Sequence, residues 1–135
     1  MDNKQIDFSK FGADTFPGFL GIEVTKVTAN FASARMKVTK ALFAPNGYLH
    51  AGSIVSLADT VAGYGCVYNL PDKGISFTTI ELKTNFLGAA QSGFIKAEAT
   101  LQHAGKTTQV WDVTVQNEEN GKTIALFRCT QLILY

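Results

Sequence analysis

The chain has 135 residues, a formal net charge of +1 and an apolar fraction of 46%. This length suits one domain with its own hydrophobic core, and the near-neutral charge does not support binding to nucleic acid or to an anionic membrane. No apolar stretch approaches the roughly 20 residues of a membrane-spanning helix, and the first ten residues lack the apolar core of a signal peptide. We therefore expect a cytoplasmic protein with a single domain, residues 1–135.

The two cysteines give no sign of a metal site or of a disulfide framework. Cys66 and Cys129 are isolated, and neither belongs to a Cys-x-x-Cys pair or has a histidine at the spacing of metal ligands. We expect no metal ion and no redox cofactor.

The first third of the sequence predicts a short helical segment followed by a strand. Residues 1–20 are polar and then aromatic, which indicates an N-terminal extension that packs on the domain as a short helix or lid. Apolar and polar side chains alternate over residues 32–38, as in a half-buried strand. The turn formers Pro45, Asn46 and Gly47 then break the alternation.

A helix is predicted from residue 53 onward, because the apolar spacing changes to three and four. The residues of this stripe are Ile54, Leu57, Ala58, Val61, Gly65 and Tyr68. Gly63 and Gly65 weaken a helix by about 1 kcal/mol each relative to alanine, so we expect them to permit close packing against a sheet. The turn formers between Asn69 and Gly74 end the helix.

All later signals are those of strands. Alternating or β-branched residues cover 75–87, 94–102, 111–116 and 123–135, and the segment 117–121 ends in the hairpin signal Asn-Gly. We expect the last three strands to form an antiparallel meander. The predicted fold is therefore α+β: one long, buried helix wrapped by a five- or six-stranded antiparallel sheet.

The start of the predicted helix and one carboxylate within it carry the chemistry. Residues 50–53, His-Ala-Gly-Ser, suit a helix N-terminus, where free backbone N–H groups bind an anion or an oxyanion. Asp59 lies among Leu57, Ala58 and Val61, and an acid in an apolar setting is a candidate base or nucleophile. The structural alternative is an aspartate that reaches solvent or caps a loop. Together the two features suggest acyl chemistry.

The separation of these two features implies a dimer. Ala51 and Asp59 are eight residues apart, which is about 12 Å along a helix axis. One carbonyl cannot contact the Ala51 amide and the Asp59 carboxylate of the same helix. In a twofold dimer with antiparallel helices, the start of one helix lies beside the middle of the other. A charged fraction of only 17%, which is common where a second subunit covers part of the surface, agrees with this expectation.

Four further residues are weaker candidates. His50, just before the helix start, suits a positioning or turn-stabilising role, with a general base as the alternative. Thr78 and Thr79 lie in the long predicted strand, where they either face water or hold an attacking water near the carboxylate. Gly105-Lys106-Thr107 is a hairpin turn signal and too short for a Walker motif, but Lys106 could meet a phosphate at the rim of a site.

These residues resemble a known family. The segment Gly47-Tyr48-Leu49-His50-Ala51-Gly52, followed by Leu57-Ala58-Asp59, is similar to the G-x-x-H-G-G…(L)-A-D signature of hotdog-fold acyl-CoA thioesterases, in the branch typified by the phenylacetate-pathway thioesterase. Weaker similarity appears in Asn85-Phe86-Leu87, in Gly105-Lys106-Thr107 and over residues 121–128. In outline the resemblance covers residues 18–134, in the family's order of elements.

The resemblance implies a hotdog fold, homodimers that often pair into homotetramers as dimers of dimers, and an acyl-CoA site at the dimer interface. It implies that Asp59 is the essential carboxylate, as general base or nucleophile, and that the Ala51 amide polarises the thioester carbonyl. His50 corresponds to the motif histidine. Thr79, or Thr78 after a shift of one residue, corresponds to the hydroxyl that positions water.

The sequence departs from the family pattern at two positions. Family members usually carry asparagine six residues before the motif histidine; here that position is Ala44, and Asn46 lies four residues before His50. The usual glycine after the histidine is Ala51, which keeps the N–H but adds a methyl group beside the carbonyl. We expect Asn46 and Gly52 to bind substrate.

We therefore predict an acyl-CoA thioesterase that hydrolyses an aromatic or fatty acyl-CoA to the free acid and CoA. CoA enters as part of the substrate, with its nucleotide near the Lys106 turn. The alternatives are a hotdog hydratase, which needs an aspartate and a histidine acting together, and a non-catalytic acyl-CoA sensor. Four aromatic residues suit either an acyl pocket or core packing, so the sequence does not identify the acyl group. They are Tyr48, Tyr64, Phe77 and Phe86.

Overall fold

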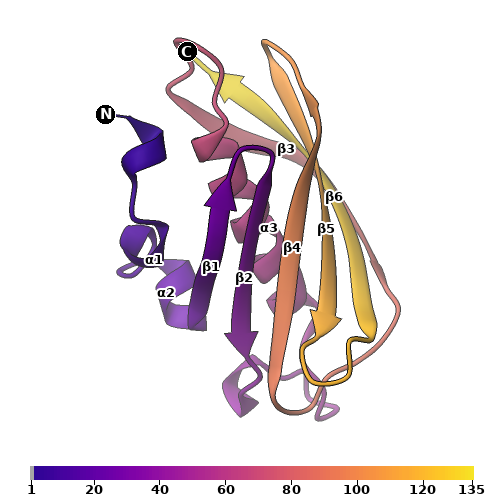
Figure 1. Ribbon diagram of the computed structural model, residues 1–135. Helices are drawn as coiled ribbons and strands as arrows, with labels where there is room; N and C mark the ends of the chain where they lie inside the picture. The colour runs from indigo at the N-terminus through magenta and orange to yellow at the C-terminus, as the bar shows by residue number, and fades with distance from the viewer. Residues whose placement is uncertain (1) are drawn as a thin grey trace.

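In the computed structural model, which describes residues 2–135, a six-stranded antiparallel sheet curves around one long helix (Figure 1). The strands are β1 (Ile22–Thr28), β2 (Phe31–Lys37), β3 (Ser76–Phe86), β4 (Phe94–Ala104), β5 (Thr108–Asn117) and β6 (Thr123–Leu134). The helices are α1 (Phe8–Phe11), α2 (Phe16–Leu20) and α3 (Ala51–Tyr68), with 3-10 helices at Asn3–Gln5 and Lys40–Leu42. The strand order is β1-β2-β4-β5-β6-β3. The α+β architecture and the β4–β5–β6 meander are confirmed.

The first two strands form a hairpin, of which the sequence predicted only the second strand. The turn of this hairpin contains Asn30 in the left-handed conformation, with a φ of 67°. A bulge between Val24 and Lys26 interrupts β1, and this bulge breaks the two-residue period by which a strand is recognised. In β2 the alternation is intact, and Ala34 and Met36 are buried in the core.

The sheet encloses α3 as the apolar stripe predicted, and Leu57 is fully buried. A methyl group added at Gly63 would lie 2.9 Å from the ring of Phe77, and one added at Gly65 would lie 2.6 Å from the ring of Trp111. Both distances are shorter than a normal carbon contact. The expected close packing of the helix on the sheet at these two glycines is confirmed.

The C-terminal end of α3 is tied to the β1–β2 turn. The side-chain amide of Asn69 donates to the carbonyl oxygens of Gly65, at 2.7 Å, and of Thr28, at 3.2 Å. The side-chain oxygen of Asn69 accepts the backbone N–H of Asn30 at 3.0 Å. These bonds fix the end of the helix at one end of the sheet, so the start of the helix lies toward the other end.

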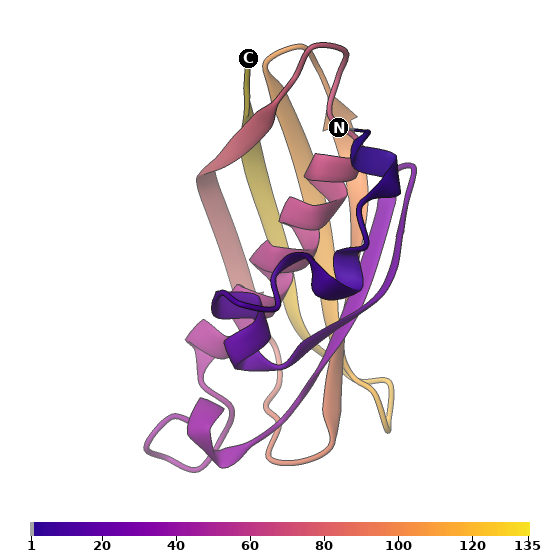
Figure 2. The ribbon, with the colours of Figure 1, turned by 90° about the vertical axis from the view of Figure 1, so that its left-hand side faces the viewer.

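The N-terminal segment packs beside β1 and against α3 (Figure 2). Phe8, Phe11 and Tyr64 form an aromatic cluster with ring centroids 5.4–5.5 Å apart. This cluster holds α1 against the outer side of the central helix. Among the helices of residues 2–135, none is long and apolar enough to cross a membrane.

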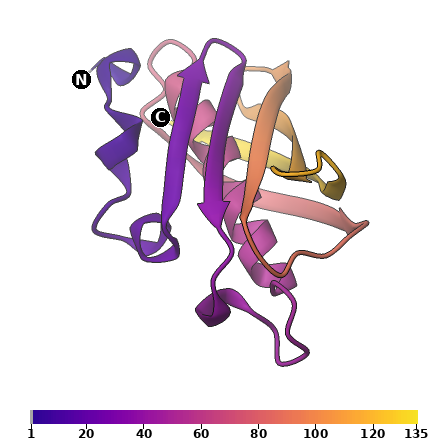
Figure 3. The ribbon, with the colours of Figure 1, turned by 60° about the horizontal axis from the view of Figure 1, so that its bottom comes forward.

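The sheet curls around α3 with β1 and β3 at its two edges (Figure 3). β3 pairs with β6, and its register shifts between Thr79 and Glu81. Thr79 pairs with Gln131, which is fully buried, so the Thr79 side chain lies on the inner face of the sheet. The neighbouring Thr78 is exposed on the outer face. β3 therefore presents one of its two consecutive threonines to the helix.

Candidate active site

The start of α3 presents one free backbone N–H. His50 caps the helix, and its Nδ1 accepts the Gly52 N–H at 2.7 Å. The His50 carbonyl accepts the N–H groups of Ser53, at 2.9 Å, and of Ile54, at 3.3 Å. Among the hydrogen bonds found within residues 2–135, none uses the Ala51 N–H. His50 thus stabilises the turn, and the Ala51 amide is the one in the first helical turn that stays open to a ligand.

A pocket of about 360 Å³ opens beside the Ala51 amide. It is lined mostly by apolar groups, from Ala44, Asn46, Tyr48, Leu49, His50, Ala51, Ile54, Phe86, Gly88 and Ala89. Asn46 reaches this pocket, and its side-chain oxygen accepts the Tyr48 N–H at 3.1 Å. The volume falls within the range of small-molecule sites. An apolar group attached to a carbonyl at Ala51 therefore has a place to bind.

The four aromatic candidates divide into two pairs. Tyr48 and Phe86 line the pocket at the helix start. Phe77 packs against Gly63 of the central helix, and Tyr64 packs in the N-terminal aromatic cluster. The first pair is placed to contact a ligand, and the second pair serves packing.

Asp59 lies in the middle of α3 and is half-buried against β3. The Thr79 hydroxyl lies 3.2 Å from Asp59 Oδ1, within hydrogen-bond distance. Burial raises the pKa of Asp59, and a hydrogen bond donated by Thr79 lowers it. A carboxyl whose pKa is raised by a partly apolar setting is suited to take up a proton during a reaction.

Thr79 also contacts a residue that the sequence did not single out. Its hydroxyl donates to Gln131 Oε1 at 2.7 Å, and Gln131 Nε2 donates to Cys129 Sγ at 3.4 Å. Gln131 is fully buried. In β6 it occupies an inward position between Cys129 and Ile133, where the alternation favours an apolar side chain. A polar residue at an apolar position of the alternation was the signal in the sequence by which Gln131 could have been found.

The structure does not bring Thr78 or Lys106 to Asp59. Thr78 lies on the opposite face of the sheet from the Asp59–Thr79 pair. Lys106 is exposed in the β4–β5 turn, where its carbonyl accepts a hydrogen bond from the Tyr135 hydroxyl. This turn lies near the C-terminus, at the end of the sheet where α3 ends (Figure 1).

Within one chain, the candidate residues form two separate groups. One group surrounds the Ala51 amide at the helix start, and the other surrounds Asp59 in the middle of the same continuous helix. Eight residues of α-helix separate Ala51 from Asp59, a distance of about 12 Å along the axis. A single small carbonyl group cannot contact both groups of one chain.

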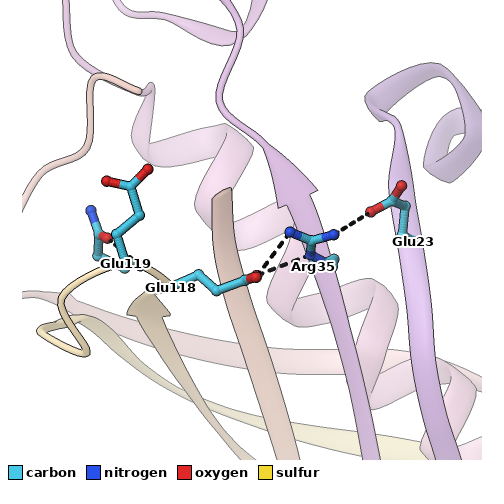
Figure 4. Close-up of polar contacts among 5 residues, drawn as sticks. Glu23, Arg35, Glu118 and Glu119 are labelled. Atoms are coloured by element: carbon cyan, nitrogen blue, oxygen red, sulfur yellow. Dashed lines mark hydrogen bonds and ion pairs between the residues drawn. The ribbon is translucent and has the colours of Figure 1, made fainter. Parts of the chain in front are cut away.

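A further polar cluster lies on the outer face of the sheet (Figure 4). The Arg35 guanidinium donates twice to Glu118, at 2.9 and 3.0 Å, and once to Glu23, at 3.4 Å. It also stacks 3.6 Å from the ring centroid of Phe94. Because two carboxylates already pair with Arg35, this cluster ties strands together and is not an anion site. Within residues 2–135, no group of three or more His, Cys, Asp or Glu side chains is arranged to hold a metal ion.

Comparison with known proteins identifies the family of this chain. Residues 46–124 match the family model described as the thioesterase superfamily. The chain is 35% identical over 111 residues to a 1,4-dihydroxy-2-naphthoyl-CoA hydrolase of Listeria monocytogenes, covering 82% of this chain and 89% of that protein. It is 33% identical over 110 residues to the acyl-coenzyme A thioesterase PaaI of Escherichia coli, covering 81% of this chain and 75% of that protein.

Solved structures agree with this assignment. A thioesterase from Haemophilus influenzae has a TM-score of 0.87 at 26% identity, covering 99% of this chain and 95% of that one. The Escherichia coli PaaI protein from the phenylacetic acid degradation operon has a TM-score of 0.80 at 30% identity, covering 88% of this chain and 83% of that one. The resemblance seen in the sequence is confirmed. The chain belongs to the thioesterase superfamily, has the hotdog fold and is a thioester hydrolase.

Proposed function

We propose that this protein hydrolyses an acyl-CoA thioester to the free acid and CoA, at a site shared by two copies of the chain. One observation carries the proposal, which is that the same helix holds both groups that the reaction needs. An open amide at its start lies beside an apolar pocket, and a half-buried carboxylate in its middle lies beside a hydroxyl. The relatives named as a naphthoyl-CoA hydrolase and an acyl-coenzyme A thioesterase support a CoA thioester as the substrate class.

In the proposed reaction, the Ala51 N–H donates to the thioester carbonyl oxygen. The positive end of α3 stabilises the negative charge that develops there. Asp59 of the second copy drives attack on the carbonyl carbon, with Thr79 holding the attacking water beside it. His50 keeps the Ala51 amide in position through its bond to the Gly52 N–H. The CoA thiolate leaves and takes up a proton.

The free edge of β3 is where we propose that the second copy binds. Five large apolar side chains lie exposed on this strand or directly beside it, with exposed fractions of 41–72%; they are Ile75, Ile80, Leu82, Phe86 and Leu87. An edge strand with unpaired backbone groups favours pairing with another strand. A twofold copy on this edge covers the apolar side chains and sets the two α3 helices antiparallel. Pairing of two such dimers into a tetramer stays a prediction from the family.

The remaining candidates take substrate-binding roles in this arrangement. Asn46 lines the pocket beside the Ala51 amide. A side chain at Gly52 would lie 3.0 Å from His50 Nδ1, so glycine there preserves the cap that leaves the Ala51 amide open to the substrate. Antiparallel pairing brings the helix start of one copy to the end of the sheet that holds the Lys106 turn of the other. There the Lys106 ammonium group meets a CoA phosphate. Thr78, exposed on the outer face of β3, contacts the outer part of the substrate.

Free-thiol release from a panel of aromatic and straight-chain acyl-CoA substrates tests this proposal. We expect the wild-type protein to turn over at least one acyl class and the Asp59→Asn variant to lose that turnover. Asp72→Asn, which changes an exposed carboxylate just after α3, is a matched control and should keep the activity. A folded dimer that is stabilised against heat by acyl-CoA, but releases no thiol from any member of the panel, would point to a non-catalytic sensor instead.

A further inference from the structure

Gln131 is a buried polar residue that contacts Thr79 of the candidate site. It has no exposed surface and pairs directly with Thr79 between β6 and β3. Its carboxamide contacts Thr79 Oγ1 on one side, at 2.7 Å, and Cys129 Sγ on the other, at 3.4 Å. A buried amide costs free energy unless its polar atoms are hydrogen-bonded, so its partners indicate what it does.

The Thr79 hydroxyl has one proton and two acceptors within reach. Gln131 Oε1 lies 2.7 Å from Thr79 Oγ1, and Asp59 Oδ1 lies 3.2 Å from it. The shorter distance is close to the optimum of an O–H···O bond, whereas the longer one exceeds the usual range of about 2.5–3.0 Å. The proton therefore points to Gln131, and the lone pairs of Thr79 Oγ1 are left facing the side of Asp59.

A water molecule that attacks a carbonyl carbon needs an acceptor for each of its two protons, since its lone pair is then aimed at the carbon. Asp59 supplies one acceptor, and Thr79 supplies the second only while its own proton is bonded elsewhere. We propose that Gln131 is a positioning residue that accepts the Thr79 proton, so that Thr79 and Asp59 together hold the nucleophilic water. This inference rests on the proposed hydrolysis of a thioester and makes Asp59 a general base.

The reaction balances with water as the nucleophile. The water oxygen bonds to the carbonyl carbon while one of its protons moves to the Asp59 carboxylate. The second proton stays on that oxygen, hydrogen-bonded to Thr79, and leaves with the carboxylic acid product. When the intermediate collapses, the carbon–sulfur bond breaks, and the CoA sulfur takes the proton from Asp59. The carboxylate of Asp59 is then restored for the next turnover.

Thr79 is the side chain whose hydrogen bond changes the pKa of Asp59. Two buried thiols, Cys129 and Cys66, belong to the same core as the helix that carries Asp59. Burial raises the pKa of each thiol to about 12, so both stay neutral. Burial raises the pKa of Asp59, and a hydrogen bond donated by Thr79 would lower it. The direction of the Thr79 proton therefore controls how far the pKa of Asp59 is raised.

Gln131→Met tests the inference because methionine has a similar length and no acceptor oxygen. The Thr79 proton then turns to Asp59, and Thr79 no longer accepts from the water. We expect kcat to fall by about tenfold, the effect of one lost hydrogen bond in the transition state. We also expect the acidic limb of the kcat pH profile to move to lower pH, because a donor to a carboxylate favours its charged form.

Gln109→Met is the matched control. Gln109 is also fully buried and pairs with Gln131 between β5 and β6. Its side chain accepts the Trp111 indole N–H and donates to the Asn69 carbonyl, both at 2.8 Å, and does not contact Thr79. Both variants should lose thermal stability, but only Gln131→Met should move the acidic limb. A limb that stays in place in Gln131→Met, or that moves equally in Gln109→Met, overturns the inference.

Thr79→Val shows whether Gln131 acts through Thr79. In the inferred arrangement the Thr79 proton is held by Gln131, so this variant removes no donor from Asp59, and it should not reproduce the move of the acidic limb to lower pH that is expected of Gln131→Met. In the Thr79→Val background, Gln131→Met should leave the limb where it is. A shift that persists without the Thr79 hydroxyl would show that Gln131 acts by another route, and the inference would be wrong.

A second measurement separates this inference from the proposed function. The pKa of the Asp59 carboxyl can be followed by ¹³C NMR in the protein without substrate, with the signal assigned by its loss in Asp59→Asn. The inference requires a lower pKa of Asp59 in Gln131→Met than in the wild type. If that decrease is found but no acyl-CoA is hydrolysed, the proposed function fails and the Thr79–Gln131 hydrogen bond stands. If hydrolysis is found without the decrease, the inference fails and the function stands.

Discussion

Thr78 and Thr79 are neighbours in β3, yet only Thr79 faces the carboxylate of Asp59. The Thr79 hydroxyl lies 3.2 Å from Asp59 Oδ1, whereas Thr78 is exposed on the other face of the sheet. Successive side chains of a strand point to opposite faces, so a shift of one residue in the register would exchange the two threonines. The pairing of Thr79 with the buried Gln131 fixes this register.

Replacing each threonine by alanine should therefore have unequal effects. Thr79→Ala is expected to lower kcat by about tenfold, because a hydrogen-bonding group next to the reacting atoms is lost. It should also reduce the free energy of unfolding by about 1–3 kcal/mol, because Gln131 Oε1 is left without a donor. Thr78→Ala should change the free energy of unfolding by less than about 0.5 kcal/mol. Thiol release and urea unfolding measure both effects, and equal losses of kcat would contradict the register.

Asp59→Asn is expected to lower kcat by about 10²–10⁴-fold without loss of stability at neutral pH. Burial raises the pKa of Asp59 above its ordinary value of 3.8, so folding disfavours the charged form. An acid whose pKa is raised on folding contributes stability below its unfolded pKa and loses it as the pH rises through its folded pKa. The Tm of Asp59→Asn relative to wild type should thus rise across this window and then stay constant. Thermal unfolding followed by circular dichroism over a pH series measures this difference, and a variant that is less stable than wild type at pH 7 would contradict it.

A shared site predicts that two inactive variants restore activity when they are mixed. Asp59→Asn lacks the carboxylate, and Ala51→Pro lacks the N–H. Proline suits the first position of a helix, and the preceding His50 has the extended conformation that proline requires, with φ of −64° and ψ of 140°. Both variants should therefore fold, and each should be inactive alone. In a mixed dimer, one of the two sites carries both changes and the other carries neither.

The fraction of wild-type activity that returns follows from the number of mixed dimers. If subunits exchange freely at equal concentrations, half of the dimers are mixed and each contains one intact site, so about a quarter of the wild-type activity should return. The control is the activity of the same mixture measured before the subunits have exchanged, when all dimers still carry one variant only. Recovery of no activity by folded, exchanged dimers would mean that each chain builds its own site.

Gly65→Ala is expected to destabilise the protein although alanine favours a helix. The added methyl group would lie 2.6 Å from the Trp111 ring, which is fully buried and cannot move away freely. Overpacking of this kind costs about 1–3 kcal/mol, which exceeds the gain of about 1 kcal/mol in helix propensity. Urea unfolding followed by circular dichroism measures the loss. In the Gly65→Ala/Trp111→Phe double variant, the loss should be smaller than the sum of the two single losses.

Local patterns in the sequence were enough for most of the elements and for part of the site. The spacing of apolar residues predicted α3, and alternation predicted β2 and the meander, because both periods depend on neighbours along the chain. β1 was not predicted, since its bulge breaks the alternation that marks a strand. The distance between Ala51 and Asp59 along one helix predicted, from the sequence alone, that a second chain contributes to the site.

The sequence by itself predicted the central helix, a helix start near His50 with free N–H groups, and the isolated acid Asp59 within the helix. Only the tertiary structure decided that Thr79 rather than Thr78 meets this acid, that Tyr48 and Phe86 line the pocket, and that a buried glutamine completes the hydrogen bonds. The physical reason is that Thr79 and Gln131 are 52 residues apart. Their contact depends on the register between β3 and β6, which is set by the packing of the whole sheet and not by any local pattern.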